Sequence, residues 1–107
     1  MTAVLEKVQR LEQYVQLTNG QVDWVLESTI DKVLDRERQR LLGQQAHLKS
    51  QIADFEVQYG WTSEAFYPRF ERGELGDDMD FVEWSATIEM VKNLQQIIEL
   101  LGERDTA

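Results

Sequence analysis

Closely spaced acidic residues are the first candidates for catalytic chemistry in this sequence. They form three pairs with the same spacing of three residues: Glu71 with Glu74, Asp77 with Asp80, and Asp80 with Glu83. Carboxylate pairs hold Mg²⁺ in many nucleotide hydrolases, provided that they share one rigid surface. Gly73 interrupts the first pair and Gly76 separates it from the other two, so we expect a solvated loop and a helix cap instead. A magnesium-dependent nucleotide hydrolase is the weakest of three functional hypotheses.

Other catalytic patterns are missing from the sequence. His47 is the single histidine and lies among Gln44, Gln45 and Lys49, without the second ligand or base that metal or triad chemistry requires. There is no cysteine, and no phosphate-binding loop, dinucleotide-binding glycine pattern or nucleophile elbow. We therefore expect a protein that is not an enzyme and that uses no metal, cofactor or small-molecule substrate.

The charge balance predicts the kind of partner. Twenty acidic residues against eleven basic ones give a net charge of -9, which repels phosphate and attracts cationic surfaces. We expect no direct binding of nucleic acid by this chain alone. The lack of cysteine fits a reducing compartment, and no apolar stretch resembles an export signal or approaches the roughly 20 residues of a membrane span. These features predict a cytoplasmic protein that does not enter a membrane.

The first 24 residues allow two readings. Val4, Val8, Leu11 and Val15 recur at spacings of four, three and four, which predicts a short amphipathic helix over residues 2–17. Alternating apolar and polar residues around Asn19-Gly20 instead favour a hairpin over residues 15–24. A lone two-stranded hairpin is marginal in water, so we prefer Gly20 as a helix stop and Asp23 as the next helix start.

A long helix is predicted over residues 23–59, ending at Gly60, because this stretch contains no proline. Its apolar stripe has two parts, made up of Val22, Leu26, Ile30 and Val33, and of Leu41, Leu48, Ile52, Phe55 and Tyr59. A segment over residues 35–40, charged except for Gln39, separates them. This segment is interpreted as a solvated face, with a hinge or a partner-exposed zone as the alternative.

Two further helices are expected after Gly60. Thr62-Ser63 offers an N-cap for a short helix that Gly73 closes, although Pro68 predicts a late start, a kink or a single irregular turn. Asp77, Asp78 or Asp80 can cap the last helix, residues 81–101, and Asp80 with Glu83 has capping-box spacing. A coiled-coil-like seam runs along it, formed by Phe81, Trp84, Ile88, Val91, Leu94, Ile98 and Leu101.

The predicted architecture is all-α: one helical unit, 1–107, in which residues 41–101 form an antiparallel helical hairpin or coiled coil and residues 1–40 project as N-terminal helices. The stripes exceed what one chain can cover, which predicts a homo-oligomer. Core and self-association contacts are assigned to Leu48, Ile52, Phe55, Phe81, Trp84, Ile88 and Val91. Contacts with a protein partner are assigned to Val8, Leu11, Val15, Trp24, Val25, Phe66, Tyr67 and Phe70. Trp24 is interpreted as an interface anchor or, equally, as a core residue.

The segment from Phe55 to Trp84, and above all the block from Phe66 to Trp84, resembles a family of small acidic bacterial and archaeal antitoxins from type II toxin–antitoxin modules. Ile30-Asp-Lys-Val-Leu34 and the following Arg36-Glu-Arg are similar to that family as well, while Pro68 departs from its helical pattern. The resemblance implies a protein that neutralises a cognate toxin, often a ribonuclease, by direct complex formation, and it implies no catalytic residues. A generic coiled-coil scaffold or adaptor is the alternative.

Overall fold

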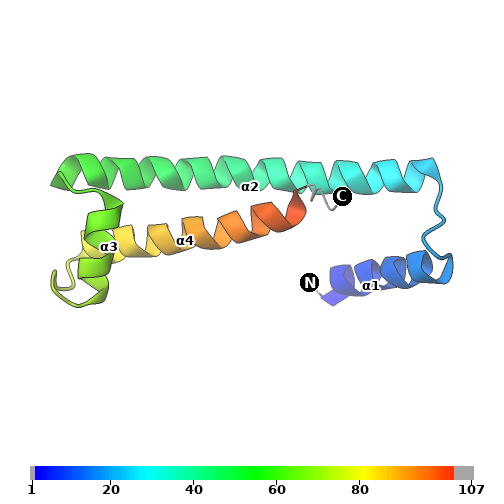
Figure 1. Ribbon diagram of the computed structural model, residues 1–107, viewed down its shortest axis with the longest axis horizontal. Helices are drawn as coiled ribbons and strands as arrows, with labels where there is room; N and C mark the ends of the chain where they lie inside the picture. The colour runs from blue at the N-terminus through cyan, green and yellow to red at the C-terminus, as the bar shows by residue number, and fades with distance from the viewer. Residues whose placement is uncertain (1, 103–107) are drawn as a thin grey trace. The chain divides into compact units, whose positions relative to one another are not determined.

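The computed structural model describes residues 2–102, which form four α-helices and no β-strand within that range (Figure 1). The helices are α1 (Thr2–Leu17), α2 (Trp24–Tyr59), α3 (Ser63–Glu71) and α4 (Met79–Leu101). The chain divides into two compact units between Val33 and Leu34. The predicted single unit with a change at residues 40 and 41 stays a prediction. The all-α class and the helical hairpin are confirmed.

The Asn19-Gly20 pair ends α1 and does not form a hairpin. Both residues have positive φ, 57° for Asn19 and 77° for Gly20. The Asn19 amide donates to the carbonyl of Gln16 at 3.1 Å, and the Gly20 amide donates to that of Val15 at 2.8 Å. These two bonds satisfy the last carbonyls of the helix in the manner of a Schellman cap. The preferred reading, a helix stop, is confirmed, and the hairpin alternative is wrong.

The ends of α2 follow from capping chemistry. The Asp23 carboxylate accepts a hydrogen bond from the Leu26 amide at 2.8 Å, which satisfies one of the unpaired donors at the helix start. At the other end the amide of Gly60, with φ of 69°, donates to the Glu56 carbonyl at 2.9 Å. α2 therefore begins within one residue of the predicted start and ends at the predicted residue.

The short helix α3 tolerates its proline. Thr62 caps it, since its hydroxyl accepts from the Ala65 amide at 3.1 Å, and the helix runs nine residues with Pro68 inside. Neither the late start nor the single irregular turn expected from Pro68 is found. The missing amide leaves the carbonyl of Glu64 without its helical donor, and Glu64 is exposed, so water can take that place.

A compact turn leads from α3 to α4. The Gly73 amide donates to the Phe70 carbonyl and the Glu74 amide to that of Arg69, at 2.9 and 3.0 Å, which again caps the helix. The Glu74 carboxylate pairs with the guanidinium groups of Arg69 and Arg72. The hydrogen bond from Arg72 holds the pKa of Glu74 below its usual value. Asp78, one of the three predicted caps, begins α4 by accepting from the Asp80 amide at 2.9 Å.

The core of the second unit lies where α2, α3 and α4 meet. Its centre is the pair Phe66 and Trp84, which are 1% and 0% exposed; their rings stack 3.9 Å apart at an interplanar angle of 3°. The buried indole of Trp84 donates to the Ser63 hydroxyl at 3.0 Å, which avoids an unpaired buried donor. The partly buried residues packed around this centre are Ile52, Phe55, Tyr59, Trp61, Tyr67, Phe70, Leu75 and Phe81.

The hairpin extends from this aromatic cluster along α2 and α4 (Figure 1). Leu41, Leu48, Ile88 and Ile98 are buried along it. Gln45 is buried as well, and its amide nitrogen donates to the Gln95 side chain at 2.9 Å and lies 3.3 Å from the Val91 carbonyl. Because a buried amide must find its partners, Gln45 fixes the register of the two helices.

Candidate protein-binding surfaces

The helix α1 exposes most of its predicted contact residues. Val4, Val8 and Leu11 are 65%, 55% and 37% exposed, and Val15 is half-buried; we call these four residues the α1 stripe. No side chain between residues 2 and 33 is buried. A 16-residue helix without buried side chains is marginal in water, so the α1 stripe contributes little to the stability of this helix.

Two further predicted contacts follow the turn after α1. Trp24 and Val25 open α2 and are 77% and 61% exposed. Trp24 is therefore not part of the core of the single chain, and its role as an interface anchor stays a prediction. Exposed tryptophans of this kind contribute strongly to binding when a partner buries them.

The aromatic residues of α3 pack mainly in the core. The sequence pattern assigns Phe66 to a partner contact, but Phe66 is buried beneath α4 against Trp84, so we correct its assignment to the core. Tyr67 and Phe70 are half-buried and pack against the same cluster. The Tyr67 hydroxyl donates to Glu89, and the Lys92 ammonium lies 4.4 Å from the centre of the Tyr67 ring. The spacing of α3 identifies an apolar helix face but not what covers that face.

The residues assigned to the core or to self-association lie together in the second unit. Trp84, Ile88 and Leu48 are buried, and the other members are half-buried: Ile52, Phe55, Phe81 and Val91. Phe55 stacks on Trp84 with ring centres 5.7 Å apart. All of them therefore contribute to the packing of a single chain.

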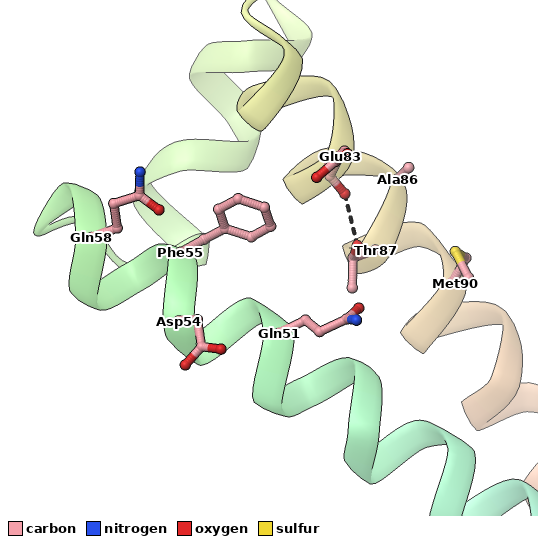
Figure 2. A pocket seen from close by; sticks show the side chains of 8 residues that line it. All are labelled: Gln51, Asp54, Phe55, Gln58, Glu83, Ala86, Thr87 and Met90. Atoms are coloured by element: carbon pink, nitrogen blue, oxygen red, sulfur yellow. Dashed lines mark hydrogen bonds between the residues drawn. The ribbon is translucent and has the colours of Figure 1, made fainter.

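A groove of about 530 Å³ runs between α2 and α4 beside this core. Figure 2 shows Phe55 and Gln51 pointing from α2 toward Thr87, whose hydroxyl donates to the Glu83 carbonyl at 2.7 Å. The complete lining is Gln51, Asp54, Phe55, Gln58, Glu83, Ala86, Thr87 and Met90. It contains two carboxylates and no basic side chain, so the groove suits apolar and neutral or cationic groups.

α4 carries a second apolar stripe, to which the sequence pattern assigns no contact. It consists of Met79, Val82, Ala86, Met90, Ile97 and Leu100, and we call it the outer α4 stripe. Its members recur at helical spacing, with Asn93 in line between Met90 and Ile97. The five large residues are exposed, from 40% for Val82 to 69% for Met79. This stripe can be recognised in the sequence as a second series of apolar residues, spaced three and four apart, beside the seam.

Two of the acidic residues in the predicted pairs make structural contacts. Asp80 accepts from the Tyr59 hydroxyl, and Glu74 pairs with two arginines. Among residues 2–102 no group of three histidine or acidic side chains is arranged to hold a metal ion. His47 is exposed, with its ring nitrogen 3.4 Å from the Gln51 amide.

Comparisons of this chain with protein-family models, with curated proteins and with solved structures find no significant match. None of the helices in residues 2–102 combines the length and the apolar character needed to cross a membrane. The surfaces described above are therefore the basis for a functional proposal.

Proposed function

We propose that this chain is a non-enzymatic, cytoplasmic antitoxin that neutralises a cognate toxin by direct complex formation. The observation that carries the proposal is the α1 stripe with Trp24 and Val25: large apolar side chains on a segment that buries none of its own residues. Such a surface is typical of a binding segment that becomes fully ordered with its partner. The family resemblance of residues 55–84 supplies the class of partner.

The charge of the chain supports a basic target. A net charge of -9 steers the protein toward a cationic surface, and a ribonuclease must present such a surface to bind RNA. Occlusion of that surface would neutralise the enzyme without any catalysis by the antitoxin. We infer that electrostatic attraction speeds the encounter and that the apolar side chains of α1 supply most of the affinity.

The test is co-expression of the chain with the product of the neighbouring gene. The wild-type chain should bind that protein and restore growth, and Val8→Glu should abolish both effects because it places a carboxylate within the apolar contact. Gln13→Glu is the matched control, since it adds the same charge to an exposed position of α1 outside the stripe. This variant should bind and rescue like the wild type.

Other outcomes of the co-expression would overturn the proposal. If the neighbouring product shows no toxicity and does not bind, the chain is better explained as a coiled-coil scaffold or adaptor. Equal rescue by Val8→Glu and by the wild type would instead remove the α1 stripe from the binding surface.

A further inference from the structure

The groove between α2 and α4, which we call the α2–α4 groove, lies between two rows of residues. The row on α2 runs from Gln51 to Gln58, and the row on α4 runs from Glu83 to Met90. Within each row the lining residues recur at intervals of three and four, so each row occupies one side of its helix. Each row is about 10 Å long at about 1.5 Å per residue. The groove therefore has two helical walls, each about two turns in length.

The apolar part of the groove is held in place by the core. The Phe55 ring stacks on the buried Trp84 with ring centres 5.7 Å apart, so its orientation is fixed before any partner binds. The Thr87 hydroxyl donates to the Glu83 carbonyl at 2.7 Å, which leaves the methyl group of Thr87 for other contacts. Met90 is 47% exposed, and its flexible thioether can fit side chains of different shapes. The groove is thus prepared to receive apolar side chains.

Each wall also contributes one carboxylate, Asp54 from α2 and Glu83 from α4 (Figure 2). Both residues are exposed. Within residues 2–102 neither carboxylate forms an ion pair, whereas Glu74 pairs with two arginines. The lining contains no lysine, arginine or histidine. The complementary positive charge is therefore one that a partner can supply.

Two kinds of occupant fit this groove poorly. A second copy of the chain carries the same net charge of -9, and two grooves facing each other would bring Asp54 and Glu83 close to identical carboxylates, which repel each other. An extended peptide finds no free backbone edge on two helices with which to pair its amides and carbonyls. An α-helix satisfies its own backbone groups and can lie along a groove between two other helices.

We propose that the α2–α4 groove is a docking site for a basic amphipathic helix of a partner protein. Apolar side chains spaced three or four residues apart on that helix enter the groove against Phe55 and Met90. Lysine or arginine side chains on both flanks of the apolar row reach Asp54 on one wall and Glu83 on the other. This site includes none of the residues of the α1 stripe, so it is a binding surface in addition to the one proposed for the toxin.

A synthetic helical peptide tests the proposal with the full chain. The probe is alanine-based and about 18 residues long, so that it can form a helix, with leucines four residues apart and arginines on both sides of the leucine row. Isothermal titration calorimetry should detect its binding. Two comparison peptides should bind at least about 10-fold more weakly: one with glutamates in place of the arginines, and one of the same composition with the arginines opposite the leucines.

Variants of the chain test the two carboxylates. Asp54→Asn combined with Glu83→Gln should raise the Kd of the arginine peptide at least about 10-fold. The matched control is Asp35→Asn combined with Glu99→Gln, which removes the same charge from exposed positions outside the groove. This control should keep the wild-type Kd within about two-fold, and circular dichroism should show equal helicity for the three proteins. Because both double variants have the same net charge, only a local contact can separate their affinities.

A measurement on the wild type locates the peptide without any substitution. The side-chain amides of Gln51 and Gln58 lie in the groove and should show NMR shift changes when the arginine peptide is added, whereas those of Gln9 and Gln13 on α1 should not. No binding, equal affinity for the three peptides, equal Kd values for the two double variants, or shift changes confined to α1 would overturn the proposal. Val8→Glu should leave the peptide affinity unchanged, so this proposal and the proposed toxin contact of α1 can fail separately.

Discussion

The hydroxyl of Tyr59 donates a hydrogen bond to the carboxylate of Asp80, and this contact joins the last turn of α2 to the first turn of α4. The amide nitrogen of Gln58 lies 3.4 Å from the same oxygen. Asp80 is free to make these contacts because Asp78 caps α4. The pair lies beside the aromatic cluster, where the Tyr59 and Trp84 rings are 6.0 Å apart, and it fixes how the hairpin closes.

This contact predicts a loss of stability at alkaline pH. The hydrogen bond to Asp80, followed by burial and the negative charges of Asp80 and Asp78, raises the pKa of Tyr59 from 10.0 to about 12. The folded state favours the neutral phenol, so the stabilisation is complete below about pH 10 and is lost as the pH rises toward about 12. Tyr59→Phe should be less stable than the wild type at neutral pH, and urea titrations should show this difference shrinking between about pH 10 and pH 12. A difference that stays constant across that range would contradict the assignment.

The stacked pair of Phe66 and Trp84 predicts the most damaging core substitution. Trp84→Ala removes the most buried side chain of the hairpin and should lower the free energy of unfolding by about 3–5 kcal/mol. Trp24→Ala is the matched control, because Trp24 is 77% exposed, and it should change stability by less than about 0.5 kcal/mol. Chemical denaturation followed by circular dichroism compares the two. Equal losses would show that Trp24 belongs to a core that the free chain already forms.

Alanine substitutions at two glycines should change the stability of the chain in opposite directions. Gly43 lies inside α2, and the space that an added methyl group would occupy there is open, so Gly43→Ala should stabilise the chain by about 0.5–1 kcal/mol. Gly60 has equally open space but a φ of 69°, and Gly60→Ala should destabilise it by about 1–2 kcal/mol. Thermal unfolding of both variants shows whether each substitution stabilises or destabilises the chain. A stabilising Gly60→Ala would mean that α2 does not end in this conformation.

The helices can be predicted from the sequence because their ends depend on local chemistry. Asp23, Thr62 and Gly60 mark boundaries that the structure places within a residue or two. The choice at Asn19-Gly20 is harder, since the same dipeptide suits a hairpin and a helix cap. The helix cap is favoured because the sequence predicts no third strand that would stabilise a hairpin.

Burial is harder to predict because it depends on contacts distant in sequence. The spacing of Phe66 resembles that of an exposed binding face, but the stacking on Trp84 places it in the core. Conversely, the sequence pattern predicts a single apolar seam on α4, although Met90 and Ile97 continue a second stripe. Periodicity shows that a helix has an apolar face, while only the packed structure shows whether that face is already covered.

Amide hydrogen exchange of residues 2–17 tests the central claim most directly. With no buried side chain in α1, its amides should exchange rapidly in the dilute free chain and at least about 100-fold more slowly in the complex with the product of the neighbouring gene. Amides of α4 around Trp84 and Ile88 should be protected in both states. Protection of α1 in the free, dilute chain, or an α1 that exchanges equally fast in the complex, would contradict the account.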